Sequence, residues 1–304
     1  MQNYISKHIG NWESITKSVT ANYQQALQFG AWGAFGGSIG SLLSELVMSG
    51  WYRNASASFI VVAIAVGIWF GIIGASICVT LLVGYSCYLK RGFRVRQSIK
   101  AGIVPGFIAG FIAGAIAQGI YATIGANEVL RVICWGIAGG LLGFQLSFHI
   151  PNLCRWRGLA GGTIGGVIGG CLFILFTFLT GVIAGRLLGL AAIGFFIGLT
   201  IILIEAVFRE AWLIVHWTPI EQTKISLGDR PVILGSSDEA HIYLRKEQGY
   251  PPITAKIYRE GQKIIMQFDP EMQQLKAMKI LRHELVNGER RKLGGVLIEV
   301  KTAQ

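Results

Sequence analysis

The residue types that carry most catalysis are sparse in this chain, and their spacing matches no common catalytic or metal-binding pattern. His216, His241 and His283 lie too far apart in the sequence to indicate a metal cluster, and no cysteine of the C-terminal third joins them. Glu271 and Glu284 have no obvious catalytic partner. No Walker loop, HExxH helix or CxxC pair occurs. We therefore expect no enzyme activity, no cofactor and no metal.

The most regular spacing in the chain belongs to glycine, which contributes 41 of the 304 residues. Glycines recur at every fourth position in several stretches between Gly30 and Gly198. In an apolar helix this spacing leaves one face without side chains, so that neighbouring helices can meet backbone to backbone. We expect helix packing at two such ridges, which are Gly102, Gly106, Gly110 and Gly114, and Gly158, Gly162, Gly166 and Gly170.

The composition is typical of a membrane protein with a soluble appendage, because 52% of the residues are hydrophobic and only 14% are charged. The formal net charge of +11 is concentrated in loops and in the C-terminal third. A cytoplasmic membrane surface explains this basic charge more simply than nucleic acid does, because short basic loops prefer the cytoplasm and the facing leaflet is anionic. Membrane lipids are therefore expected partners, and nucleic acid is not.

Six segments are long and apolar enough to cross a membrane as helices. They lie near residues 28–49, 59–88, 102–124, 130–150, 158–184 and 187–208. Lysine and arginine gather after the second and fourth segments and at the end of the sixth, which favours a cytoplasmic location for both termini. We expect a multi-pass protein of a bacterial inner membrane.

Residues 1–27 precede the first predicted span and carry one apolar helical stripe. An amphipathic helix lying on the cytoplasmic leaflet fits this stripe. A helix packed on the soluble domain fits it equally well, and the sequence leaves both open.

The odd-numbered spans resemble one another in their glycine content, and each even-numbered span begins with small residues and becomes bulky. This pattern predicts a two-helix hairpin used three times, with pseudo-symmetry about the membrane normal and the odd helices closest to the axis. Gln118 and Gln145 are the deeper polar residues. Either could line a path, although an interhelical hydrogen bond is the more common role. The shortage of charge at bilayer depth disfavours a proton-coupled transporter.

Residues 209–304 show a different pattern, with short β-rich runs separated by turn residues. Examples of the runs are residues 211–217, 253–259 and 263–268, and Gly228-Asp229 is one of the turns. Many short strands at close spacing predict a small all-β sandwich.

Several features of this third of the chain carry a family resemblance. Gly235 ends a predicted strand, and the segment from His241 to Leu244 forms the next one. Residues 255–257 match a later strand, and Glu289 to Val300 form a closing hairpin with Gly294-Gly295 at its bend. This order resembles the forkhead-associated (FHA) family. The resemblance implies an FHA-like sandwich, and FHA domains bind phosphothreonine peptides through a loop Arg, a loop Ser and an Asn.

The chain departs from the family at those binding positions. Ser236 stands where the family has its Arg, Pro251 or Pro252 stands where it has its Ser, and Thr254 stands where it has a His. The resemblance therefore implies a protein-binding sandwich that has lost or replaced its phosphate site. The residues expected to contact a partner are Ser236, Ser237, Thr254, Arg245, Lys246, Lys256 and Arg259.

These features predict an integral membrane scaffold or adaptor. Residues 1–27 form its interfacial helix, residues 28–208 its six-helix bundle and residues 209–304 a cytoplasmic FHA-like domain that binds a cytoplasmic or membrane protein. The bundle could also form a homo-oligomer through its glycine ridges. The alternative is a channel or small-solute pore gated by the C-terminal domain. A subunit of a larger membrane machine is a third possibility.

Overall fold

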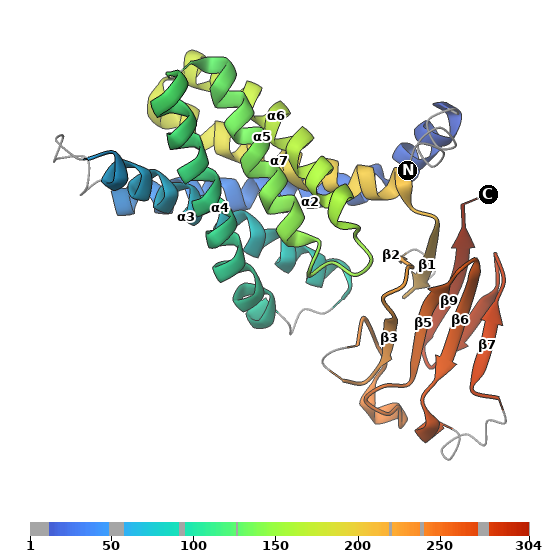
Figure 1. Ribbon diagram of the computed structural model, residues 1–304. Helices are drawn as coiled ribbons and strands as arrows, with labels where there is room; N and C mark the ends of the chain where they lie inside the picture. Colours follow the sequence, from blue (N-terminus) through green and yellow to red (C-terminus); the bar gives the residue numbers. More distant parts are fainter. Residues whose placement is uncertain are drawn as a thin grey trace. The chain divides into compact units, whose positions relative to one another are not determined.

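The computed structural model describes residues 12–48, 58–90, 95–125, 127–218, 221–237, 240–272 and 280–303. The chain divides into two compact units, one helical and one built of β-strands (Figure 1). The helical unit comprises Met1–Ser86 and Val95–Phe208. The β unit comprises Cys87–Arg94 and Arg209–Gln304.

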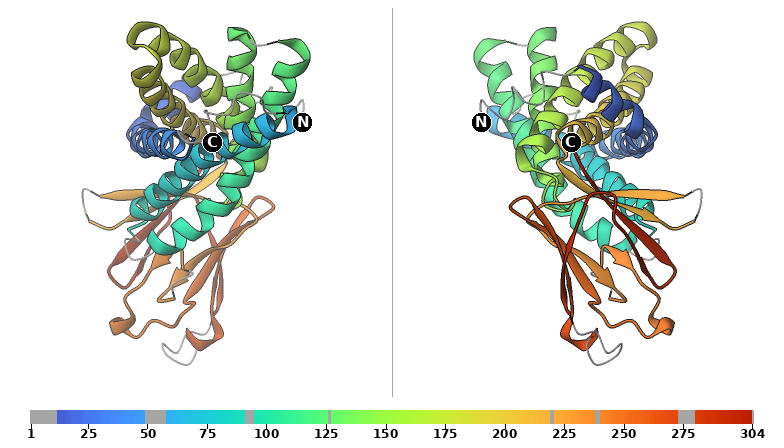
Figure 2. Two further views of the ribbon diagram at one scale, coloured as in Figure 1. Left: turned by 90° about the vertical axis from the view of Figure 1, so that its left-hand side faces the viewer. Right: turned by 90° about the vertical axis from the view of Figure 1, so that its right-hand side faces the viewer.

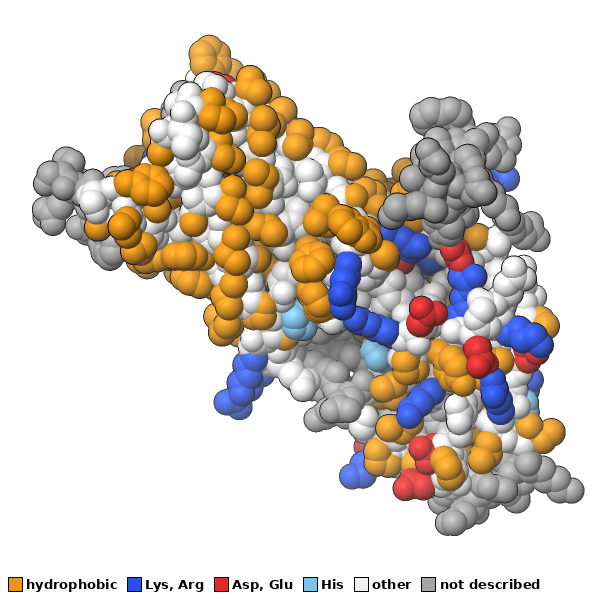
Figure 3. Space-filling model, viewed as in Figure 1, with side chains coloured by type: hydrophobic (Ala, Val, Ile, Leu, Met, Phe, Trp, Pro, Cys, Tyr) orange, Lys and Arg blue, Asp and Glu red, His pale blue; other side chains and the backbone are white. Residues whose placement is uncertain are grey.

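The described part of the helical unit contains six long helices. They are α2 (Trp12–Met48), α3 (Phe59–Tyr88), α4 (Val95–Ile124), α5 (Glu128–Leu146), α6 (Arg155–Thr180) and α7 (Val182–Phe208). By length and composition, all of them except α2 could cross a membrane, which gives five candidate spans among the described residues. Apolar side chains cover the viewed face of this unit (Figure 3), as a multi-pass membrane protein requires.

Helix α2 joins two segments that the sequence analysis separates. The predicted boundary between residues 27 and 28 lies inside one helix of 37 residues, and residues 1–11 lie outside the described part of the chain. At 1.5 Å per residue α2 is about 55 Å long, against about 30 Å for a hydrocarbon core. A change from polar to apolar composition does not end a helix when neither proline nor a glycine with positive φ interrupts it.

The boundary between α6 and α7 lies earlier than expected. The sequence predicts it between residues 184 and 187, whereas α6 ends at Thr180 and α7 begins at Val182. Gly181 separates the helices with a φ of 80°, which glycine adopts at little cost.

Glycine brings the helix backbones into contact along both predicted ridges. The ridge from Gly102 to Gly114 faces α3, where a Cβ added at Gly106 would lie 2.8 Å from Cys78 Cβ. The ridge from Gly158 to Gly170 faces α5, where a Cβ added at Gly162 would overlap the carbonyl oxygen of Gly139. These glycines therefore set how closely α4 approaches α3 and α6 approaches α5.

The first and last of the described helices, α2 and α7, meet in the same way. A Cβ added at Gly33 of α2 would overlap the carbonyl oxygen of Gly194 on α7, and one added at Gly194 would overlap that of Gly33. One turn further along α2, a Cβ added at Gly37 would overlap the Leu190 carbonyl. The bundle is therefore closed by a contact between helices at opposite ends of the sequence.

The large, fully buried side chains of the bundle come from the even-numbered spans. All of them lie on α3, α5 and α7: Ile73, Ile77, Leu81, Leu146, Leu190, Ile193 and Ile197. The expectation that the odd spans lie closest to a repeat axis stays a prediction, because burial alone does not define such an axis. The odd spans supply grooves instead, because glycines such as Gly40 and Gly169 receive the backbones at Ile73 and Ile193.

Two ion pairs join α7 to its neighbours. Arg186, near the start of α7, donates to Glu45 of α2 at 2.7 Å. Glu205, near the end of α7, lies 3.4 Å from the Arg157 guanidinium of α6. Gln145 reaches His149, four residues further on, at 3.5 Å rather than a neighbouring helix. Charges near the ends of the spans therefore add to the glycine contacts in holding α7.

The β unit contains two sheets (Figure 2). The four-stranded sheet has the order β2-β1-β9-β8 and the five-stranded sheet the order β4-β3-β5-β6-β7, with only β3 and β4 paired in parallel. The strands are β1 (Ala211–His216), β2 (Gln222–Ser226), β3 (Val232–Gly235), β4 (Ile242–Tyr243), β5 (Ala255–Glu260), β6 (Lys263–Phe268), β7 (Arg282–Leu285), β8 (Arg290–Leu293) and β9 (Val296–Thr302).

Alternating burial along the strands explains why these residues form sheets. Leu213 and Val215 of β1 are fully buried, whereas Trp212, Ile214 and His216 between and beside them are only partly buried. This period of two places every second side chain in the core. The predicted β-rich character of the C-terminal third is confirmed.

The end of α3 and the residues that follow it complete the β unit. The Lys224 amide donates to the Tyr88 hydroxyl at 2.7 Å, and Thr223 Oγ1 donates to the Tyr88 carbonyl at 3.2 Å. Lys90 forms an ion pair with Glu221. The otherwise open edge of β2 is thereby covered by residues 87–90, which protects it from pairing with another chain.

Replacing Gly162 with alanine should destabilise the bundle, because the new Cβ would overlap the Gly139 carbonyl oxygen. We expect a loss of about 1–3 kcal/mol, visible as a lower thermal midpoint of the purified protein in detergent. Gly119→Ala is the matched control, since a Cβ there meets no atom within 4 Å and alanine is the better helix former. Equal effects of the two substitutions would contradict a tight contact at Gly162.

Candidate partner-binding surface of the β-domain

Two loops are joined at one end of residues 209–304, here called the β-domain. Ser236 and Ser237, which follow β3, donate their amides to the carbonyls of Pro251 and Pro252 at 3.1 Å each. The Ser236 hydroxyl donates to the Tyr250 carbonyl at 2.8 Å. These bonds fix the loop before β5 against the loop after β3.

A third loop packs against the same place. Gly294, in the turn between β8 and β9, has a φ of 60°, and a Cβ added there would lie 2.7 Å from Gln248 Oε1 and 3.0 Å from the Tyr250 ring. Glycine is therefore required for both the turn and the close approach. The loop end is defined here as Ser236–Ser237, Arg245–Pro252 and Gly294–Gly295.

Four of the seven predicted partner-contacting residues lie in the loop end. Ser236 and Ser237 are partly buried, and Arg245 and Lys246 are exposed. Ser237 Oγ is buried and makes no hydrogen bond within the described part of the chain. The loop end thus presents two exposed cationic side chains beside a backbone that is held by hydrogen bonds.

The other three predicted residues lie elsewhere. Thr254 is fully buried, and its hydroxyl donates to the Pro251 carbonyl at 3.3 Å, so it shapes the loop and cannot contact a partner. Lys256 is partly buried and lies opposite Gln267 in the five-stranded sheet. Arg259, near the far end of β5, is paired with Glu210. A linear motif could not reveal that β5 carries these side chains away from the loop end.

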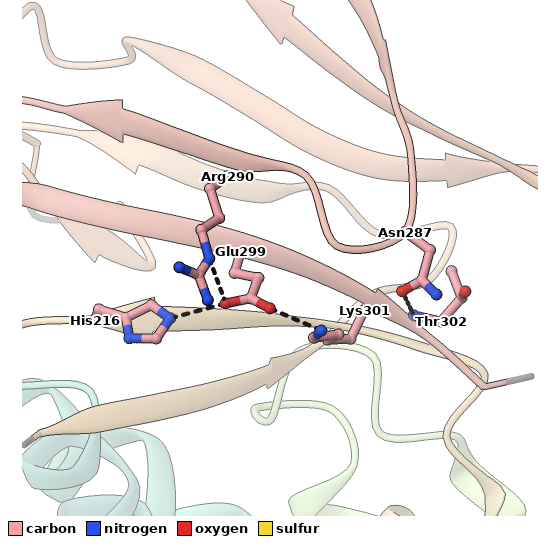
Figure 4. A network of polar contacts seen from close by, with 6 residues as sticks. All are labelled: His216, Asn287, Arg290, Glu299, Lys301 and Thr302. Carbon is pink, nitrogen blue, oxygen red and sulfur yellow. Dashed lines mark hydrogen bonds and ion pairs between the residues drawn. The ribbon is translucent and has the colours of Figure 1, made fainter.

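The outer face of the four-stranded sheet holds a charge network that the sequence analysis missed (Figure 4). Glu299 of β9 is only 5% exposed. Its carboxylate accepts from Lys301 at 2.8 Å and from Arg290 Nε at 3.0 Å, and it lies 3.3 Å from His216 Nε2. The hydrogen bond from Lys301 is the largest of the effects that hold the pKa of Glu299 below its ordinary value, and Arg290 and His216 add to it.

Part of this network was visible in the sequence. The alternation along β9 places Glu299 and Lys301 on one face, and that along β1 places His216 on an outer face. The cross-strand register, in which Glu299 lies opposite both Ile214 and Arg290, is a tertiary fact that no local pattern specifies.

One sequence motif associated with catalysis lies in a structure that does not suit that chemistry. The letters GxSxG occur once, at Gly36–Gly40, but Ser38 lies within α2 and both outer glycines pack on α3, so this is no strand-to-helix turn. Among the described residues, no group of three or more His, Cys, Asp or Glu side chains could hold a metal ion. Comparison of the chain with protein-family models, with curated proteins and with solved structures finds no match.

Glu299→Gln should destabilise the β-domain at neutral pH by about 1–3 kcal/mol, because it removes the charge that three neighbouring side chains share. The lowered folded pKa means that ionised Glu299 contributes fully above its unfolded pKa, about 4.3. That contribution is lost as the pH falls through the folded value. Thermal unfolding of the intact protein at several pH values should show the two midpoints converging in acid.

Glu284→Gln is the control for this prediction. Glu284 pairs with Lys263, and the side chains are 49% and 65% exposed respectively. A pair in such contact with solvent contributes little to stability. A midpoint difference between wild type and Glu299→Gln that does not change with pH would contradict the role given to the Glu299 charge.

Proposed function

We propose that this protein is a membrane adaptor whose β-domain binds a protein partner at the loop end. The observation that carries the proposal is the position of the loop end on the sheet. Ala211, three residues after the end of α7, pairs with Thr302 of β9, whereas Gly294 lies just beyond the other end of β9. At about 3.3 Å per residue, the loop end lies about 26 Å along the sheet from the attachment of the β-domain to α7.

The FHA-like reading of the β-domain has support in the strand order. The first and last strands are neighbours, and β8 and β9 form the closing hairpin with Gly294 at its bend. The Arg position of the family is held by Ser236, whose hydroxyl is already bonded to Tyr250. We therefore propose recognition of an unphosphorylated segment, with Arg245 and Lys246 as the charged contacts.

We also propose an arrangement of the helices in the membrane. Helix α2 crosses it in addition to the five candidate spans, both termini are in the cytoplasm of a bacterial cell, and the bundle consists of three hairpins. The supporting observation is that each odd span meets an even span through glycine in an equivalent order. Helix α4 meets α3, α6 meets α5, and α2 closes the set by meeting α7.

The filling of the bundle favours an adaptor over a pore. Ile73, Ile77, Ile193 and Ile197 are fully buried and contact glycine-lined grooves, so aliphatic side chains occupy the interior of the described bundle. A hydrated path needs polar groups or open space instead.

Affinity capture of the full-length protein from mild detergent tests the adaptor. We expect a specific partner with the wild-type chain, its loss from a chain truncated after Phe208, and at least a tenfold reduction with Arg245→Glu/Lys246→Glu. Lys263→Glu is the control. Lys263 is 65% exposed and lies at the start of β6, opposite Glu260, whereas the loop end lies beyond the other end of these two strands. Capture that survives the truncation would overturn the proposal.

We expect no flux of ions or small neutral solutes through the reconstituted protein, because its interior is filled with aliphatic side chains. Liposome flux should be measured with the full chain and with the chain truncated after Phe208. Flux that appears on truncation would instead support the gated pore.

A further inference from the structure

The outer face of the four-stranded sheet gathers more positive charge than its acidic residues offset. Cross-strand pairing places Lys224, Arg290, Lys292 and Lys301 on the side of the sheet that carries Trp212 and Ile214. We call these four residues the basic face. Glu299 is the carboxylate that faces them, and it is shared with His216 as well.

Three of the four cations of the basic face are accessible to solvent. The Arg290 side chain is 62% exposed and that of Lys301 is 38% exposed although both contact Glu299. Lys292 is exposed as well. Burial, and to a smaller extent the nearby Arg209, lowers the pKa of Lys224.

Chain connectivity keeps this sheet close to the membrane. Only Arg209 and Glu210 separate the end of α7 at Phe208 from the start of β1. Three Cα steps cover at most about 11 Å, so the sheet begins within that distance of the end of a candidate span. At its edge, β2 is also hydrogen-bonded to Tyr88, the last residue of α3. The two attachments are therefore at β1 and β2, which belong to the sheet that carries the basic face.

We propose that the basic face binds the anionic headgroups of the membrane in which the protein is embedded. Basic side chains near an anionic leaflet each strengthen association about fivefold, and the attraction falls off within a Debye length. Trp212 adds an aromatic ring of the kind that favours the headgroup region. This contact fixes the orientation of the β-domain and does not depend on the proposed partner at the loop end.

Lysine labelling tests this inference on the full-length protein in nanodiscs. A neutral acetylating reagent is applied in discs of zwitterionic lipid and in discs that also contain phosphatidylglycerol, and the modified lysines are read by mass spectrometry. We expect Lys292 and Lys301 to react at least fivefold more slowly in the anionic discs and to recover in 1 M salt, where the Debye length is about 3 Å. Lys256 and Lys263, on the five-stranded sheet, serve as internal controls.

A matched pair of variants sharpens the test. Arg290→Gln should reduce the protection of Lys292 in anionic discs about fivefold. Arg282→Gln should leave it unchanged, because Arg282 is a comparably exposed arginine, paired with Glu260 on the five-stranded sheet. The variants also separate this proposal from the adaptor, since neither changes the loop end.

Three outcomes would overturn the proposal. Equal, fast labelling in both discs would mean that the basic face is free in solution. Equal, slow labelling in both would mean that protein covers it. Equal protection by inorganic phosphate added to zwitterionic discs would indicate a site for free anions rather than a lipid surface.

Discussion

The approach of one helix backbone to another is the constraint on which the helical unit depends. At Gly33 and Gly194, and again at Gly139 and Gly162, a single added carbon would overlap a carbonyl oxygen of the neighbouring helix. Lipid chains are as apolar as leucine, so burial of apolar surface does not drive these helices together. Close contact of backbones, with isoleucines filling the adjacent grooves, supplies the dispersion energy in its place. The ion pairs of Arg186 and Glu205 hold the ends of α7 in the register that this contact requires.

The β-domain is held together by different interactions. Its inner faces form an apolar core, whereas the outer face of the four-stranded sheet is ordered by one carboxylate, that of Glu299. Residues 87–90, from the last turn of α3 and the two residues after it, cover the edge of β2. The loop end has backbone hydrogen bonds of its own, which join the amides of Ser236 and Ser237 to the carbonyls of Pro251 and Pro252.

The spacing of the hydrophobic residues and the composition were sufficient to predict which segments form helices and which form strands. The apolar runs gave the helices, and the alternating runs gave the strands, with β1 and β6 close to their predicted bounds. The ends of helices were harder to predict where a backbone conformation sets them. Gly181 is an example, because its positive φ separates α6 from α7. The seven predicted partner contacts were read from neighbours in sequence, and only four of them meet in space. Burial of Thr254 and pairing of Arg259 with Glu210 depend on contacts across the fold, which no local motif encodes.

The contact of α2 with α7 also governs how the chain can assemble. The glycine surface of α2 around Gly33 and Gly37 is synthesised first, yet its partner around Leu190 and Gly194 is synthesised last among the helices. The contact of α2 with α7 can therefore form only once the last described helix of the bundle has been synthesised. Only two residues separate the end of α7 from β1, so synthesis of the strands follows directly on synthesis of the last described helix.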